Sequence, residues 1–223
     1  MNNLSSLPGQ SGLCDPNFVV QHIPIAKNAT AYLGYESLKY RWQHQFVPYS
    51  TTIARFVILR DPFERYLSAV VADISHTDIY KNFLFSNNQD KANNIFDKIF
   101  EENKPSTQTI DGLPPFLVNK FYLGYHTIIQ TNFLQLQSAT LNLYTFFKMS
   151  ITLGDDLNKY FQEIDCNARF SNRKLYESNE YQSHIRNKLN SYLESRKKIK
   201  NELMEYLQPD YNLLQLIDFH NGK

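Results

Sequence analysis

Two short polar stretches of this sequence carry side chains that could bind an anion. Lys27 and Thr30 follow the apolar run 17–25, and Arg60 ends the apolar run 52–60. A stretch with helical periodicity follows each run, and the first backbone amides of a helix attract negative charge. A cation with a hydroxyl at one turn, and a second cation at the next turn, predict a pair of phosphate-binding positions.

The second turn has the residue types that start a helix. Asp61 is a good N-cap, Pro62 suits the first helical position, and Glu64 completes a spacing that resembles a capping box. Ser68 follows Asp61 by seven residues, about two turns along the helix and on the side of Glu64. Arg60 and Ser68 could therefore hold one phosphate together. The alternative interpretation is an arginine–glutamate surface pair beside a helical serine.

The elements that would position these residues predict an α/β fold. The runs 17–25, 52–60 and 142–149 are predicted strands, and a helical pattern follows each of them. This order favours a central parallel sheet flanked by helices, in which ligands bind at the carboxyl ends of the strands. We expect residues 1–16 to be a flexible tail and residues 17–223 to form one domain. A long amphipathic helix is predicted over 181–206.

Composition excludes several classes of protein. The chain has 223 residues, 42% of them hydrophobic, and a net charge of +1, so we expect neither nucleic acid nor a membrane surface as a partner. No apolar run reaches the ~18–20 residues of a membrane span, and the N-terminus does not resemble a signal peptide, so we expect a soluble, cytoplasmic protein. Cys14 and Cys166 form no metal-binding spacing and are predicted free thiols. Nothing in the sequence indicates an oligomeric state.

The two turns resemble the signature loops of sulfotransferases that use 3′-phosphoadenosine 5′-phosphosulfate (PAPS). Lys27-Asn28-Ala29-Thr30 resembles the 5′-phosphosulfate loop of that family, often written PKxGTT. Residues 60–68 match its 3′-phosphate motif, RDPxxRxxS, at every fixed position. The first loop departs from the pattern, because Pro24 is not adjacent to the lysine, Ala29 replaces a glycine, and Ala31 replaces a second hydroxyl residue.

Segments further along the chain resemble the carbohydrate-type branch of the same family. They are His126 with Gln130, the polar stretch Asn172-Arg173-Lys174, and the final PDYNLLQ at 209–215. The resemblance therefore implies a fold like that of P-loop NTPases and a hydroxyl acceptor, which we expect to be a carbohydrate. The nucleotide-triphosphatase motif itself, GxxxxGK(S/T), is absent, which disfavours the alternative of a small-molecule kinase.

The resemblance also implies a role for each site residue. Lys27 would stabilise the leaving 5′-phosphate, and Arg60 with Ser68 would bind the 3′-phosphate. The remaining cofactor-binding positions are Asn28, Ala29, Thr30 and Ala31 in the first loop, and Asn172, Arg173 and Lys174 in the later stretch. Sulfuryl transfer needs positioning and fixed cations, so no metal is expected.

The acceptor hydroxyl also needs a general base. Glu36 and His44 lie between the two loops, where relatives place this residue, and His126 is a third candidate. We favour His44, because the unperturbed pKa of histidine suits the task. The alternative function is a non-catalytic nucleotide-binding or interaction protein that keeps the sulfotransferase fold.

Overall fold

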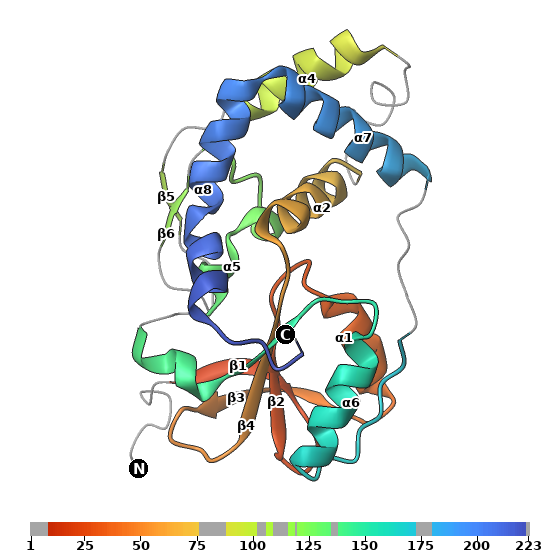
Figure 1. Cartoon of the computed structure of the whole chain (residues 1–223), viewed down its shortest axis with the longest axis vertical. Coiled ribbons are helices and arrows are strands. Elements are labelled where there is room, and N and C mark those ends of the chain that lie inside the picture. The colour runs from red at the N-terminus through yellow and green to blue at the C-terminus, as the bar shows by residue number, and fades with distance from the viewer. Residues whose placement is uncertain are drawn as a thin grey trace. The chain divides into compact units, whose positions relative to one another are not determined.

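The computed structural model describes residues 9–75, 88–101, 106–108, 116–118, 120–134, 138–172 and 180–221 (Figure 1). The chain divides into two compact units. A sheet unit comprises Met1–Arg60, Leu134–Tyr176 and Ile217–Lys223, and a helical unit comprises Asp61–Phe133 and Glu177–Leu216. The expectation of one domain over 17–223 stays a prediction.

The sheet of the first unit is mixed. Its described strands are β1 (Gly9–Cys14), β2 (Val20–Ile23), β3 (Gln43–Pro48), β4 (Ala54–Leu59) and β7 (Thr145–Lys148), in the order β3-β1-β2-β4-β7. Strands β2, β4 and β7 run parallel, whereas β1 pairs antiparallel with both β2 and β3. The predicted α/β class with helices on a sheet is confirmed, and the three predicted strands form the parallel part.

One correction concerns the N-terminal segment. The prediction of a flexible tail is wrong for residues 9–14, which form β1. The residues around His44, for which no element was predicted, form β3 at the edge of the sheet. Neither strand has an apolar run, since β1 reads GQSGLC and β3 reads QHQFVP, with half of its residues exposed. Gly12 permits close strand pairing, because a Cβ there would lie 2.3 Å from the carbonyl oxygen of His22.

A layer of helices covers one face of this sheet. Helix α1 (Thr30–Leu38) follows β2, and α6 (Leu153–Glu163) follows β7. A short 3-10 helix, η3 (Ser138–Leu143), precedes β7. Phe56 of β4 lies at the centre of this core, fully buried against the rings of Trp42 and Phe161. All six residues of β4 but the first are buried, which explains its nearly continuous apolar sequence.

The second unit is mainly helical. It contains α2 (Pro62–Ser75), α4 (Gln89–Glu101), η2 (Tyr125–Thr127), α5 (Gln130–Phe133), α7 (Glu180–Ser195) and α8 (Lys197–Leu216), with a two-stranded hairpin of β5 (Ser106–Gln108) and β6 (Phe116–Val118). Its core packs α2 against α7 and α8 around large side chains such as Tyr66, Phe96 and Tyr192.

The long helix predicted over 181–206 is two helices. Helix α7 ends at Ser195 and α8 begins at Lys197, so the break falls at Arg196. Helix α8 then continues through Pro209 to Leu216. The carboxylate of Asp210 accepts hydrogen bonds from the backbone amides of Gln130 and Thr131, which fixes the start of α5 against α8.

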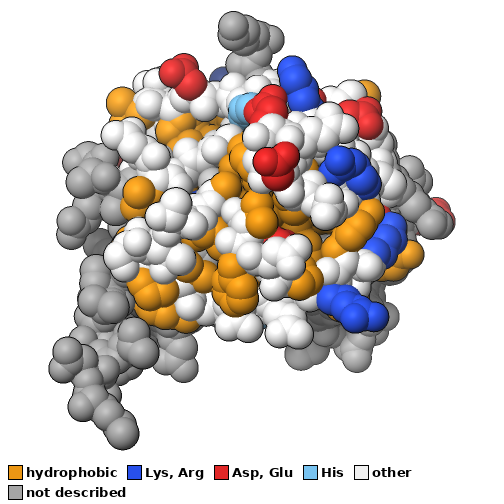
Figure 2. All heavy atoms as spheres, turned by 90° about the horizontal axis from the view of Figure 1, so that it is seen from below, with side chains coloured by type: hydrophobic (Ala, Val, Ile, Leu, Met, Phe, Trp, Pro, Cys, Tyr) orange, Lys and Arg blue, Asp and Glu red, His pale blue; other side chains and the backbone are white. Residues whose placement is uncertain are grey.

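Three observations describe the helices and the surface of the molecule. Within the described part of the chain, no helix has the length and apolar character needed to cross a bilayer. Figure 2 shows one face, on which hydrophobic side chains are interspersed with polar ones. In the sheet unit, large exposed hydrophobic residues include Phe18, Phe46 and Leu143.

Candidate functional site

The turn between β2 and α1 has an unusual backbone. Lys27 and Ala29 adopt positive φ angles of 65° and 58°, in the left-handed region that favours glycine. The carbonyl oxygen of Ile25 closes the turn, because it accepts the backbone amide of Asn28 at 3.0 Å and the hydroxyl of Thr30 at 2.7 Å. Ala29 therefore adopts a conformation in which glycine is preferred, at the position where the sulfotransferase loop that this turn resembles has glycine.

The start of α1 presents backbone amides. Ala29 is the N-cap residue, and no side chain caps the helix. The first-turn amides of a helix have no intrahelical partner and carry partial positive charge. Lys27 is half-buried beside this turn, and Ala31 is exposed in the first turn. The turn therefore combines a cation with amide donors, which together can bind a phosphate or sulfonate.

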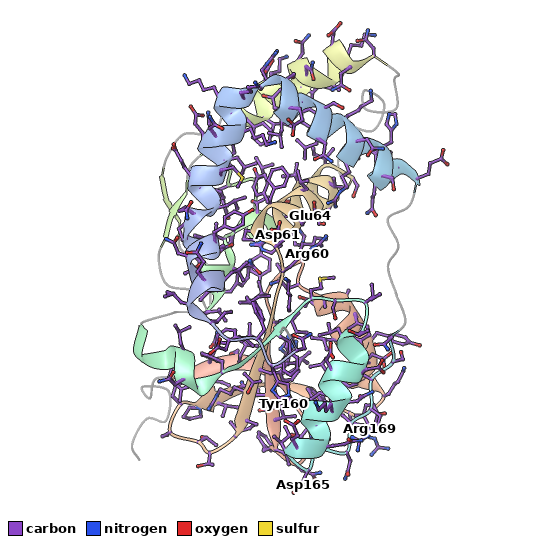
Figure 3. All side chains as sticks on the ribbon, viewed as in Figure 1. Arg60, Asp61, Glu64, Tyr160, Asp165 and Arg169 are labelled. Carbon is purple, nitrogen blue, oxygen red and sulfur yellow. The ribbon has the colours of Figure 1, made fainter. Side chains whose placement is uncertain are left out.

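Arg60 lies at the same edge of the sheet as this turn. It follows β4 directly, is half-buried, and appears at the end of that strand in Figure 3. Strands β2 and β4 are parallel neighbours, with Ile23 opposite Val57, so the chain leaves both strands at the same edge. The side-chain amide of Asn28 joins them, because it donates a 2.9 Å hydrogen bond to the carbonyl oxygen of Ile58.

Asn28 thus has a structural task. Its side chain is fully buried and binds β4, and its backbone amide donates to the carbonyl oxygen of Ile25, so both groups hold the turn together. The hydroxyl proton of Thr30 is likewise engaged by Ile25, which makes this side chain part of the turn. Of the predicted first-loop ligands, Lys27 and the amides of the first turn retain the chemistry expected of them.

Helix α2 begins as predicted. The carboxylate of Asp61 accepts the backbone amide of Glu64 at 2.8 Å, and Pro62 is the first helical residue. The hydroxyl of Ser68 donates to the carbonyl oxygen of Glu64 and accepts a 3.3 Å hydrogen bond from Arg186 of α7. Arg186 also forms an ion pair with the Glu64 carboxylate.

An arginine–glutamate pair therefore does lie beside Ser68, and its arginine is Arg186. Nothing local in the sequence indicated this residue, because it is 118 positions from Ser68. Arg60 and Ser68 belong to different units, so their joint binding of one phosphate stays a prediction.

The later polar stretch is only partly described. The side chain of Asn172 accepts the backbone amide of Asp155 at 3.1 Å and donates to the Asp155 carboxylate at 2.5 Å. It thereby supports the first turn of α6. Arg173 and Lys174, the other two predicted ligands of this stretch, lie outside the described residues.

Glu36 is poorly suited to be a general base. It is fully buried, 2.8 Å from the amine of Lys39, and its carboxylate accepts both the amide and the hydroxyl of Ser171. Burial alone would raise the pKa of Glu36, but the hydrogen bonds from Lys39 and Ser171 outweigh it, and the pKa is lowered. A carboxylate held in this state accepts protons weakly.

His44 is exposed on the edge strand β3. It lies opposite Leu13 of β1, which in turn lies opposite His22 of β2. His44 is therefore level with the end of β2, two strands or about 10 Å to the side. The structure describes no hydrogen-bond partner for its ring, so nothing in the described part of the chain orients it.

His126 has the arrangement expected of an oriented base. Its Nδ1 lies 2.6 Å from a carboxylate oxygen of Asp73, and its side chain is 38% exposed. A carboxylate that accepts the Nδ1 proton leaves Nε2 as the acceptor. Arg65 donates a 2.9 Å hydrogen bond to the His126 backbone carbonyl and fixes the position of η2. Sequence spacing gave no sign of Asp73, because it lies 53 residues from His126.

Comparisons with protein-family models, with curated proteins and with solved structures find no match to this chain. Among the residues described, no group of three or more histidine, cysteine, aspartate or glutamate side chains could hold a metal ion. The chemistry that can be argued is therefore that of the two turns and of the histidine–aspartate pair.

Proposed function

We propose that this protein transfers a sulfuryl group from PAPS to an acceptor hydroxyl, which we expect to belong to a carbohydrate. The observation that carries the proposal is the placement of Lys27 and Arg60. They follow adjacent parallel strands at one edge of the sheet, and the hydrogen bond from Asn28 to Ile58 connects the first turn to β4, the strand that ends just before Arg60. This arrangement provides two cations for a ligand that carries two separated phosphates.

The proposed reaction is an in-line displacement at sulfur. The acceptor oxygen forms a new bond to sulfur while the bond between sulfur and the 5′-phosphate oxygen breaks. The leaving nucleotide takes that electron pair, and Lys27 and the first-turn amides of α1 stabilise its added charge. The proton of the acceptor hydroxyl passes to a general base. Thr30 shapes the turn through Ile25 and donates to the ligand only if that hydrogen bond is released.

Recognition of the 3′-phosphate is assigned to Arg60 and Ser68. A guanidinium can bind phosphate through two parallel hydrogen bonds, and a hydroxyl fixes its orientation. Arg186 adds a second cation beside Ser68, although it must share its charge with Glu64. Discrimination between 3′-phosphorylated and unphosphorylated adenosine nucleotides is the property that depends on these residues.

The general base is assigned to a histidine. Glu36 is disfavoured because its carboxylate is buried and ion-paired. His44 has the accessibility that a base requires, and His126 has both accessibility and an orienting carboxylate. Tyr125 lies next to His126 with 49% of its surface exposed, and an exposed aromatic ring is a suitable platform for a sugar. The proposal therefore keeps both histidines and tests them separately.

The decisive experiment combines transfer and binding. Wild-type protein, Lys27→Ala, Arg60→Ala and the control Lys159→Ala, which alters an exposed lysine of α6, are each mixed with ³⁵S-labelled PAPS and a panel of carbohydrates. Lys27→Ala should abolish transfer, and the control should not. Binding of 3′,5′-adenosine bisphosphate and of adenosine 5′-monophosphate is measured by calorimetry. Arg60→Ala should weaken binding of the bisphosphate by a factor at least ten times larger than its effect on binding of the monophosphate.

Two outcomes would change the conclusion. Tight binding of the bisphosphate without transfer to any acceptor would support the non-catalytic nucleotide-binding alternative. The methyl group of Ala29, where related loops have glycine, is the observation that favours it. Equal weakening of both nucleotides by Arg60→Ala would remove that residue from 3′-phosphate recognition.

A further inference from the structure

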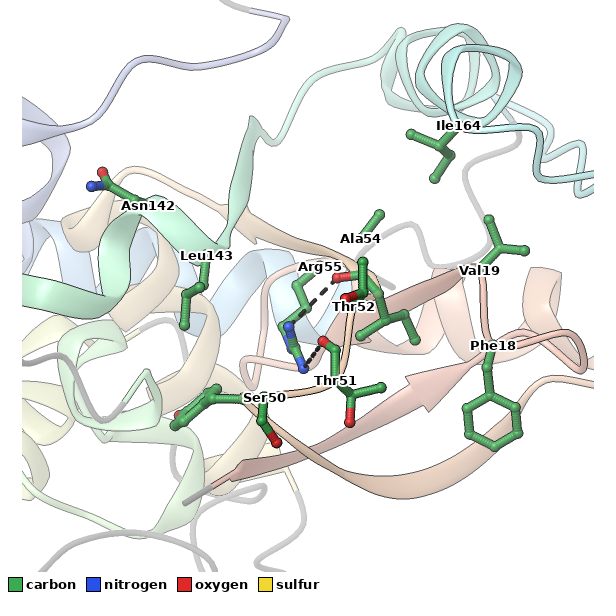
Figure 4. A pocket seen from close by; sticks show the side chains of 12 residues that line it. Phe18, Val19, Ser50, Thr51, Thr52, Ala54, Arg55, Asn142, Leu143 and Ile164 are labelled. Atoms are coloured by element: carbon green, nitrogen blue, oxygen red, sulfur yellow. Dashed lines mark hydrogen bonds between the residues drawn. The ribbon is translucent and has the colours of Figure 1, made fainter. Parts of the chain in front are cut away.

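A pocket lies at the sheet edge opposite the Lys27 and Arg60 turns. It is formed where β2 and β4 begin, so its lining includes Val19, which directly precedes β2, and Ala54, the first residue of β4 (Figure 4). Its volume of about 640 Å³ falls within the range of small-molecule sites. The lining belongs entirely to the sheet unit. The proposed sulfuryl transfer uses none of it.

Arg55 is the charged residue of this pocket. Its side chain is only 3% exposed, and all of its described hydrogen bonds go to neutral acceptors. They are the side chain of Gln21 at 3.2 Å and the backbone carbonyls of Pro48 at 2.7 Å, Thr51 at 3.4 Å and Ile53 at 3.5 Å. Among the residues that the structure describes, no carboxylate pairs with Arg55.

This environment gives the buried positive charge no negative partner within the described part of the chain, although the ring of Tyr49 lies 5.9 Å from the guanidinium carbon. Neutral oxygens satisfy a guanidinium geometrically, but they do not neutralise it, and an unpaired buried charge is strongly unfavourable. Burial accordingly lowers the pKa of Arg55. A guanidinium has five N–H donors, whereas four hydrogen bonds are described, two of them at 3.4 Å or longer. Arg55 therefore retains both charge and donor capacity for an anion.

The rest of the lining is amphipathic. Ser50 and Thr52 contribute hydroxyl groups to the lining, and Phe18 and Leu143 contribute apolar surface (Figure 4). Phe18 is 50% exposed and has a φ of 54°, an unfavourable conformation for a bulky residue. Leu143 is 38% exposed. The pocket thus exposes two large apolar side chains to water beside a buried cation. This combination indicates a ligand that covers the apolar side chains and neutralises the cation.

We propose that this pocket binds a small organic monocarboxylate whose apolar body packs against Phe18 and Leu143. The carboxylate pairs with Arg55, and the nearby hydroxyls donate to its remaining lone pairs. A single negative charge fits best, because one guanidinium balances it. The carbonyl oxygens of Pro48, Thr51 and Ile53 would repel the second charge of a phosphate dianion.

The test is an NMR titration of the full ¹⁵N-labelled chain with benzoate, with neutral benzamide and with phenyl phosphate. Benzoate should bind at least tenfold more tightly than benzamide, and the shifted amides should be those of residues 50–55. Phe18→Ala should weaken the binding of both benzoate and benzamide. Leu143→Glu, which places a negative charge beside the pocket, should weaken benzoate binding at least tenfold and benzamide binding much less.

Leu38→Glu is the matched control, because it adds the same charge at an exposed leucine at the end of α1. It should leave benzoate binding unchanged. The proposal is overturned if no benzoate binding is detected at concentrations up to about 10 mM. A site with a dissociation constant of about 1 mM would be nearly saturated at that concentration. Equal binding of benzamide, tighter binding of phenyl phosphate, amide shifts confined to other segments, or indifference to Leu143→Glu would overturn it as well.

Discussion

The side-chain amide of Asn28 donates a hydrogen bond to the backbone carbonyl oxygen of Ile58, 30 residues further along the chain. Asn28 directly follows Lys27 in the first turn, and Ile58 lies in β4 two residues before Arg60. Because both groups are buried, the contact holds the β2–α1 turn against β4 without competition from water. The relative position of the two turns therefore depends on a residue that sequence comparison would treat as a ligand.

Asn28→Ala should destabilise the protein by about 1–3 kcal/mol, because it leaves the buried carbonyl of Ile58 without its donor. The free energy of unfolding is measured by urea denaturation. Asn142→Ala, at an exposed asparagine of the same unit, should change it by less than about 0.5 kcal/mol. Equal stability of the two variants would mean that the Asn28 contact contributes nothing.

Ala29→Gly should stabilise the fold. The left-handed conformation costs an L-residue about 1–2 kcal/mol, whereas glycine loses about 0.4–1 kcal/mol through the greater freedom of its unfolded chain. We expect a net gain of up to about 1.6 kcal/mol in the free energy of unfolding, measured by urea denaturation. Removal of the methyl group should also tighten binding of 3′,5′-adenosine bisphosphate, because the backbone can approach the phosphate more closely. Ala31→Gly, at the exposed helical position, should instead destabilise α1.

His22 should make the protein sensitive to acid. Its ring is buried against Phe56, and burial, with a smaller effect of His44, lowers the pKa from 6.5 to about 3. Between pH 6.5 and about 3, His22 is therefore protonated in the unfolded chain and neutral in the folded chain. Protonation of His22 should leave the free energy of unfolding unchanged above pH 6.5. It should lower the free energy of unfolding by about 1.4 kcal/mol per pH unit as the pH drops from 6.5 toward 3. His22→Leu should remove this part of the slope in urea denaturation, and His44→Leu, at an exposed position, should retain it.

Asp73→Asn should lower turnover by on the order of 10²–10⁴, if His126 is the base of the proposed reaction. Asparagine can donate to Nδ1, which moves the imidazole proton to Nε2 and leaves no acceptor there. The affinity for 3′,5′-adenosine bisphosphate should not change. His126→Gln and His44→Gln are assayed in parallel for transfer from labelled PAPS. Loss of turnover in His44→Gln alone would assign the base to the sheet unit.

Glu36→Gln should retain transfer activity per folded molecule. Glutamine keeps an acceptor for Ser171 but loses the charge that pairs with Lys39. Since the folded pKa of Glu36 is lowered from 4.5, its contribution to stability is present above pH 4.5 and lost as the pH falls below it. The variant should lack this acid-dependent loss in urea denaturation. Abolished turnover in a fully folded Glu36→Gln protein would identify Glu36 as the base after all.

The sequence alone determined the local units of the fold. The apolar runs that contain β2, β4 and β7, and the Asp61-Pro62 start of α2, depend on burial patterns and caps within a few residues, so periodicity and start signals predict them. The sequence also placed a cation at each of two neighbouring turns. Their meeting at one edge followed from the rule for parallel strands.

Only the tertiary structure decided the pairing of the remaining strands and the state of the polar side chains. Strands β1 and β3 have little apolar signal, and their places depend on partners elsewhere in the sheet. The carboxylate of Glu36 accepts hydrogen bonds from Ser171, 135 residues away, and Asp73 orients His126 across 53 residues. A titratable group takes its charge and role from the groups that fold against it, and the residue types around it in the chain do not specify those groups.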